Sequence, residues 1–236
     1  MAVHEPICVD GPAAEVGAHL LARLLARGLA ALRAPTVLDL SFPRDWDGRL
    51  AYAISWIASP PVAAAVALGA AAAAQAVPGA WAWAGLYVAL GIATPVVYLV
   101  WLARTGRVTD LDVQLRRQRA RPLLFTLTCG ALATALLALG GAPPTLTALA
   151  IALWLETALL FGITLRWKIS VHCAAAASAA TWVWLLTGTL WPLLVGVPLV
   201  AWSRVRLRRH TLPQTIAGAL LGSAIVWSVL ALVGGR

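Results

Sequence analysis

Long apolar runs separated by short basic segments restrict how this chain can fold more than any other feature. Hydrophobic residues make up 61% of the 236 positions and charged residues 11%, whereas soluble domains are nearer half apolar and a quarter charged. A helix of about 20 apolar residues is long enough to cross a bilayer. The sequence therefore predicts an all-α, polytopic transmembrane helix bundle.

Seven apolar segments can be delimited, which predicts six to seven membrane spans. Turns rich in Pro and Gly separate several of them, and Pro60-Pro61 is expected to kink the first. The segments cover residues 52–76, 80–102, 123–139, 145–165, 170–186, 190–203 and 211–234. The chain is thereby divided into an N-terminal segment, residues 1–50, and a transmembrane bundle, residues 51–236.

The N-terminal segment is too charged to cross a membrane. Within residues 12–33, leucines between Leu20 and Leu25 lie on one helical face, but Arg23 and Arg27 interrupt the apolar pattern. An interfacial amphipathic helix is expected, and a surface helix packed on the bundle is the alternative. No secretory signal peptide is expected, because acidic residues break up the first thirty positions.

The net charge of +9 is concentrated on one side of the expected bundle. If each segment crosses the membrane once, 17 of the 18 basic residues lie on the side of the N-terminal segment. The positive-inside rule makes this side cytoplasmic, so we expect a multi-pass cell-membrane protein whose active face is cytoplasmic. Orientation and anionic lipid headgroups account for the charge, and nucleic acid is not expected as a partner.

Three polar clusters lie on that side, each at the end of a predicted helix. They cover residues 116–122, 168–172 and 203–214, and two of them combine a histidine with basic residues. Arginine binds phosphate oxygens through paired, charge-assisted hydrogen bonds. Histidine can attack phosphorus or protonate a leaving oxygen near neutral pH. The clusters therefore indicate metal-independent phosphoryl transfer on a membrane lipid.

The spacing within the clusters resembles the motifs of the type-2 phosphatidic acid phosphatase superfamily, which includes membrane lipid phosphatases and vanadium haloperoxidases. The resemblance extends over residues 104–225. Ser203-Arg204, five residues, His210, three residues and Gln214 resemble the third motif, Ser-Arg-(five)-His-(three)-Asp. Ser170-Val171-His172 resembles the second motif, Pro-Ser-Gly-His, and Arg121-Pro122 resembles the end of the first, Lys-(six)-Arg-Pro.

The resemblance implies a role for each of these residues. His210 would be the nucleophile, forming a phosphohistidine, and His172 would be the acid that protonates the leaving group. Arg204 and Arg121 would hold the phosphate oxygens, and Ser170 would contribute a hydrogen bond. No metal or other cofactor is expected in this mechanism.

Two departures from the family pattern affect these roles. Gln214 stands where the family has the Asp that orients the nucleophile. Its carbonyl can fix the tautomer of His210 but cannot stabilise an imidazolium by charge, so reduced activity is an alternative. Gln114 stands where the family has Lys, and Lys168 could supply that charge to the substrate phosphate.

The assignment of Arg121 leaves alternatives open. Two predicted helices separate it from the second motif, where the family usually has only a loop. Arg117, Arg116 or Arg119 could therefore bind phosphate in its place.

Acidic residues inside the bundle region suggest further possibilities. Asp110 and Asp112 are expected to pair with nearby arginines, with metal binding as the alternative. Glu156 lies within an apolar segment, where an acid is a functional candidate or faces the bundle interior in a hydrogen-bonded state. Gly218 and Gly222 have the spacing of close helix packing.

These observations predict an integral-membrane phosphatase that hydrolyses a lipid phosphate monoester or diphosphate. Phosphatidate, phosphatidylglycerol phosphate and isoprenyl phosphates or diphosphates all fit, so the expected partners are a lipid phosphate substrate and membrane lipids. The oligomeric state is left open. One alternative is a protein that binds or transports a lipid phosphate without hydrolysing it. Another is an intramembrane prenyl or terpene diphosphate enzyme, which would require paired acidic motifs.

Overall fold

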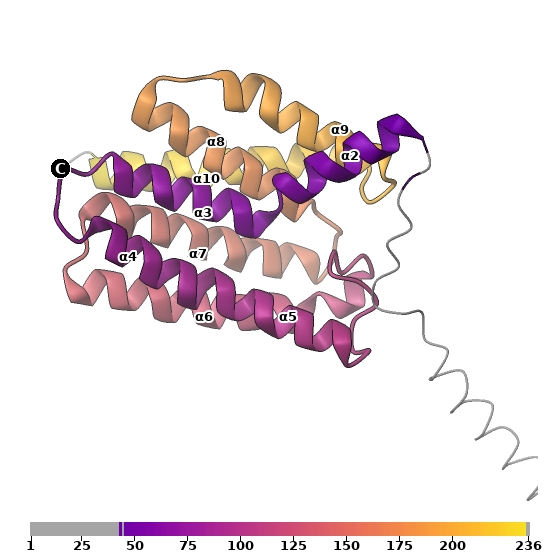
Figure 1. Cartoon of the computed structure of the whole chain (residues 1–236), viewed down its shortest axis with the longest axis horizontal. Coiled ribbons are helices and arrows are strands. Elements are labelled where there is room, and N and C mark those ends of the chain that lie inside the picture. The colour runs from indigo at the N-terminus through magenta and orange to yellow at the C-terminus, as the bar shows by residue number, and fades with distance from the viewer. Residues whose placement is uncertain (1–42, 44, 235–236) are drawn as a thin grey trace, which may run out of the picture. The chain divides into compact units, whose positions relative to one another are not determined.

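The computed structural model describes residue 43 and residues 45–234, and those residues are helical along most of their length (Figure 1). The first apolar segment forms α2 (Trp46–Ile57) and α3 (Pro60–Ala73), which are bent by 50° relative to each other. The two prolines occupy the first turn of α3, where a missing backbone N–H costs least. The predicted kink is confirmed.

The next segment is one continuous helical run with a π-helical centre. It consists of α4 (Ala80–Tyr87), η1 (Val88–Ala93) and α5 (Thr94–Arg104). A connection containing the short helix η2 (Arg116–Gln118) leads to α6 (Ala120–Gly140), and α7 (Pro144–Thr164) returns antiparallel to it. Gly141 ends α6 with a φ of 79°, a conformation that glycine adopts without strain.

Three helices complete the described chain. They are α8 (Val171–Thr187), α9 (Val197–Arg206), which follows the π-helical turn η3 (Pro192–Gly196), and α10 (Leu212–Gly234). Each of the seven predicted segments corresponds to one of these helices or helix pairs. The predicted amphipathic helix in residues 12–33 lies outside the described residues.

The length and composition of the helices do not confirm the predicted number of six to seven membrane spans. In the described part of the chain, four runs are long and apolar enough to cross a bilayer, and the bent α2–α3 pair raises the number to five. The helix α8 has 17 residues and α9 has 10, against about 20 for a full crossing. Polar residues at the start of α8 and the end of α9 shorten these two apolar segments.

Close packing of α8 against α10 brings two of the sequence clusters together. A Cβ atom on Gly218 would lie 2.4 Å from the carbonyl oxygen of Ser170, and one on Gly222 would lie 2.2 Å from that of Ala174. Only glycine allows backbones to approach this closely. The predicted packing role of Gly218 and Gly222 is confirmed, and the two helices run parallel with their N-termini side by side.

The outward side chains of the bundle are largely apolar. Large exposed hydrophobic residues include Leu132 on α6, Leu159 on α7 and Leu220 on α10, all within helix interiors. In contrast, Glu156 on α7 is buried and accepts a hydrogen bond from the Ser178 hydroxyl. An apolar exterior around such an interior is compatible with a multi-pass membrane protein.

Candidate active site

The three sequence clusters meet at one end of the bundle, where the connections after α5, α7 and α9 gather (right in Figure 1). The Ser170 N–H donates to the Gln214 carbonyl at 3.2 Å, which joins the starts of α8 and α10. Arg119 donates to the Ile169 carbonyl at 3.2 Å, which attaches the first cluster to the second. Segments about 50 and 100 residues apart in sequence therefore form one site.

The turn between α9 and α10 places His210 above the end of α9. The N–H groups of Arg209 and His210 donate to the Arg204 carbonyl at 2.9 and 3.2 Å, and Arg208 donates to Val205 at 2.9 Å. This is a Schellman closure, in which the residue after the cap adopts the left-handed conformation. Here that residue is Arg208, with a φ of 53°. The closure explains why Arg204 and His210 are separated by five residues.

His210 is held in one orientation by Gln214. The His210 Nδ1 lies 3.1 Å from Gln214 Oε1, and the Thr211 N–H donates to the same oxygen at 3.2 Å. Because a backbone N–H must donate, this atom is an acceptor and Nδ1 carries the proton. The Nε2 atom of His210 is left with a free lone pair.

The surroundings of His210 keep its imidazole neutral. Burial and the positive charges of Arg119, Arg204 and Lys168 lower its pKa to about 3, against a smaller opposing effect of the Gln214 hydrogen bond. Its side chain is only 7% exposed. Burial and the charges of Arg119, Arg204 and Arg209 also lower the pKa of the Lys168 ammonium. The site therefore combines a neutral imidazole with excess positive charge.

Arg204 is the most deeply buried cation of the site, with 1% of its surface exposed. Its Nη1 atom lies 2.5 Å from the Ser55 hydroxyl, and both terminal nitrogens bind Asp112 Oδ2 at 3.2 and 3.1 Å. Its Nε is buried and has no hydrogen-bond partner among the described residues. An unpaired buried donor of this kind is costly unless a ligand supplies the acceptor.

Asp112 lies among positive charges, but its ion pairs are with the distant Arg204 and Arg209 and not with the nearby arginines that were predicted. Burial alone would raise the pKa of its carboxyl group, but Arg204, His172 and Arg209 outweigh that effect and lower it. The carboxylate is therefore ionised. The His172 Nε2 atom, on the first turn of α8, lies 3.7 Å from Asp112 Oδ1, and the His172 side chain is 13% exposed.

Ser170 occupies the N-cap position of α8. Its hydroxyl oxygen accepts the Cys173 N–H at 3.3 Å, and the residue is fully buried. This capping contact fixes the first turn of α8 and with it His172. A hydrogen bond from Ser170 to phosphate stays a prediction.

The structure brings Arg119 into the site instead of Arg121 or Arg117. Arg119 is 6% exposed, and its Nε donates to the Val113 carbonyl at 2.8 Å. Arg117 and Arg121 are exposed and form no hydrogen bond or ion pair with other described residues. Arg119 directly precedes α6 and extends back across the connection, whereas Arg121 already belongs to the helix.

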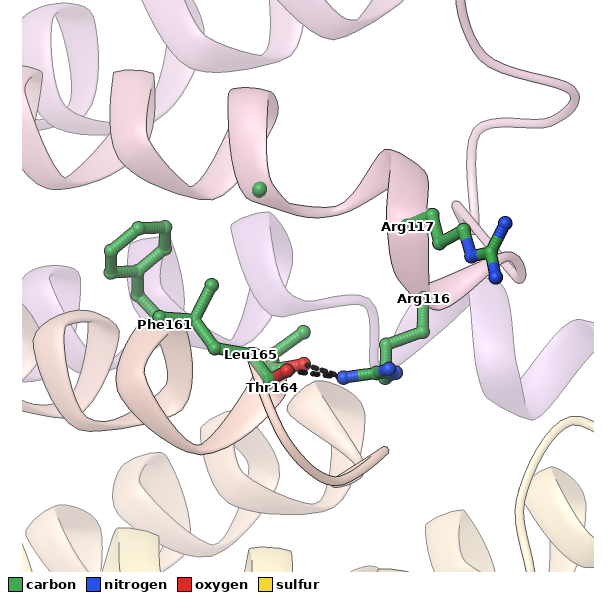
Figure 2. A pocket seen from close by; sticks show the side chains of 6 residues that line it. Arg116, Arg117, Phe161, Thr164 and Leu165 are labelled. Carbon is green, nitrogen blue, oxygen red and sulfur yellow. Dashed lines mark hydrogen bonds between the residues drawn. The ribbon is translucent and has the colours of Figure 1, made fainter.

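Arg116 has a structural role at the end of α7. Its guanidinium donates to the carbonyls of Thr164, at 3.3 Å, and Leu165 (Figure 2). These are terminal carbonyls that the helix itself leaves unpaired. Arg117 points away from them, at the edge of a cleft of about 230 Å³. This cleft is lined by Phe161 and contains neither histidine.

Sequence reasoning missed Ser55. This residue lies on α2, within the first apolar segment, and is buried against Arg204. A serine in an alanine-rich run has no motif around it. The only signal in the sequence was that Ser55 is a polar residue with apolar neighbours.

Comparison with known proteins found one family. The family model of the PAP2 superfamily matches residues 118–236, which include the second and third clusters and Arg119. Searches of curated proteins and of solved structures each found no match to the chain.

Proposed function

The chain belongs to the PAP2 superfamily, and from this premise we propose that it is an integral-membrane lipid phosphatase. The superfamily generally comprises phosphatases, which supports a phosphoric ester hydrolase. The observation that carries the proposal is the neutral His210, whose free Nε2 lies within a buried, positively charged site. Such a site suits a substrate that brings its own negative charge.

The first step transfers the phosphoryl group to the enzyme. The His210 Nε2 lone pair forms a bond to phosphorus while the bond from phosphorus to the ester or anhydride oxygen breaks. His172, which holds an extra proton when the negative charge of the bound phosphate is beside it, donates that proton to the leaving oxygen and becomes neutral. Arg204, with its unpaired Nε–H, Arg119 and Lys168 stabilise the charge on the remaining oxygens.

The second step regenerates His210. A water molecule attacks the phosphorus of the phosphohistidine, neutral His172 accepts its proton, and the phosphorus–nitrogen bond breaks. Gln214 keeps the Nδ1–H of His210 in place throughout. Because an amide lacks the charge of Asp, this arrangement suits a nucleophile that stays neutral until it reacts.

The substrate is a lipid phosphate monoester or diphosphate of the phosphatidate or isoprenyl type. Apolar side chains cover the outside of the helices, so a lipid tail can stay in the bilayer while its phosphate reaches the end of the bundle. The excess of basic residues on this side supports a cytoplasmic active face in the cell membrane.

Release of inorganic phosphate by the purified, detergent-solubilised protein tests the proposal. Phosphatidate and farnesyl diphosphate should both be tried with EDTA present, and the variant His210→Ala should lose the activity. Arg204→Ala should lower kcat/KM by about 10²–10³-fold, because it removes a buried phosphate ligand. Arg104→Ala, at an exposed position without ion pairs to described residues, is the matched control. Release that persists in His210→Ala would contradict the mechanism.

Gln214 favours a second candidate, a protein that binds lipid phosphates without hydrolysing them. The variant Gln214→Asp restores the family motif and separates the two functions. A silent wild type together with an active Gln214→Asp would establish the binding protein. Silence of both, with tight lipid-phosphate binding, would also exclude the phosphatase.

A further inference from the structure

Asp112 contacts two of the groups to which the proposed mechanism assigns the substrate, Arg204 and His172. Its Oδ2 atom accepts hydrogen bonds from both terminal nitrogens of Arg204 and lies 3.7 Å from Arg209 Nε. Its Oδ1 atom faces His172 Nε2 at 3.7 Å. A carboxylate and a phosphate present similar oxygens to an arginine fork, so the carboxylate mimics two oxygens of a bound phosphate.

We propose that Asp112 competes with the substrate phosphate for Arg204 and His172, and thereby makes the site selective for phosphates attached to an apolar tail. This inference rests on the proposed function. A phosphate cannot take the same donors while the carboxylate stays, because like charges at contact distance repel strongly. Binding therefore requires that Asp112 moves out.

The displacement of Asp112 favours lipid phosphates over free phosphate. A lipid substrate gains further binding energy from its tail, and that energy can offset the loss of the Asp112 ion pairs. Inorganic phosphate has only its own ion pairs to exchange for those of Asp112. After hydrolysis the freed phosphate no longer has a tail that adds binding energy. The return of Asp112 to Arg204 and His172 therefore promotes its release.

The backbone next to Asp112 is suited to such a movement. Val113 has a φ of 43°, a left-handed conformation that is strained for a β-branched residue. Its carbonyl is held by Arg119 at 2.8 Å, and the Asp112 side chain by Arg204. These side-chain contacts thus hold the connection in a backbone conformation that it does not favour. Breaking the Asp112 contacts therefore also relieves strain.

Inhibition by inorganic phosphate tests the competition. Asp112→Asn keeps the shape of the side chain and removes its charge. The inhibition constant for phosphate should be at least about tenfold lower in this variant than in wild type. In wild type the ion pairs of Asp112 keep most molecules closed to phosphate, and in the variant they do not. The KM for the lipid should fall by a smaller factor, and kcat should keep its order of magnitude. Asp45→Asn removes a carboxylate charge that pairs with Arg206, a residue that the proposal does not use, and should leave phosphate inhibition nearly unchanged.

Two outcomes would overturn the proposal. One is phosphate inhibition that is the same in wild type and Asp112→Asn. The other is a large loss of kcat at constant KM, which would make Asp112 a positioning residue for His172. Asp112→Ser provides the same test if Asp112→Asn does not fold, as judged by thermal unfolding in detergent.

Direct binding separates this proposal from the phosphatase function. Calorimetric titration with inorganic phosphate needs no turnover. Tighter phosphate binding by Asp112→Asn than by a wild type that hydrolyses nothing would support the competition and exclude the phosphatase. Hydrolysis by wild type, together with equal phosphate affinities of wild type and Asp112→Asn, would support the phosphatase and overturn the competition.

Discussion

The α8–α10 pair and the connection over residues 105–119 build the two sides of the candidate site in different ways. In the helix pair, backbone lies on backbone at Gly218 and Gly222, and hydrogen bonds fix the turn before α10. The connection consists of turns and one short 3-10 helix and has a strained residue at Val113. The two histidines of the proposed mechanism lie on the side of the helix pair, which we call the rigid side. The connection, which we call the adjustable side, contributes charge through Asp112 and Arg119.

This difference fits the demands of the chemistry. A nucleophile and an acid must keep their mutual geometry to within fractions of an ångström, and two helices in contact through glycines provide that. A group that binds and releases a charged ligand benefits from a segment with more than one accessible conformation. Substitutions on the two sides should therefore have different effects on stability and activity.

The largest effect is expected from breaking the rigid side. Gly222→Val places a branched side chain against the Ala174 carbonyl, 2.2 Å from the position of the new Cβ. The two backbones must separate, so the free energy of unfolding should fall by about 3 kcal/mol or more, and activity should be lost. Thermal or denaturant unfolding in detergent measures the change. Gly162→Ala on α7, where nothing lies within 4 Å, is the control; equal stability of the two variants would refute the packing argument.

A smaller effect is expected from the charges of the adjustable side. Arg119→Ala should lower kcat/KM by about tenfold, because it removes one buried guanidinium from the site, with little change in Arg121→Ala. Steady-state kinetics on the two variants compares residues that are two positions apart in sequence. A larger loss in Arg121→Ala would restore the assignment made from the family motif.

A further expected effect is a pH dependence that links the two sides. The pKa of His210 is lowered from 6.5 to about 3 by burial and by Arg119 and Arg204. Below about pH 6.5 the unfolded chain therefore binds a proton that the folded chain does not, so the free energy of unfolding falls as the pH decreases towards 3. Thermal unfolding between pH 4 and 8 should show a weaker pH dependence in His210→Gln than in wild type. Parallel curves would mean that folding leaves the pKa of His210 unchanged and would contradict this prediction.

The rigid side could be predicted from the sequence, because its information is local. Helix ends at Ser170 and near His210, the Gly218–Gly222 spacing and the motif distances all depend on residues close together in the chain. The predicted helix 145–165 matches Pro144–Thr164, and 170–186 matches Val171–Thr187. Periodicity and spacing are enough for such elements.

The adjustable side could be predicted only in part. The pairing of Asp112 with arginine was expected from charge, but its partner Arg204 is 92 residues away, and no local pattern specifies that contact. The choice between Arg119 and Arg121 depended on where α6 begins, and helix ends are the least certain part of a prediction. The predicted span number of six to seven is not confirmed, because α8 and α9 are shorter than a full crossing.

The contact of Arg204 with Ser55 has a consequence for how the protein can be divided. The superfamily match begins at residue 118, yet both side-chain partners of the buried Arg204 guanidinium, Ser55 and Asp112, precede that position. A fragment cut at the border of the match would retain both histidines and leave this cation buried without its partners. The recognisable half of the chain is thus not an independent module, and any transplanted, truncated or redesigned version has to begin no later than α2.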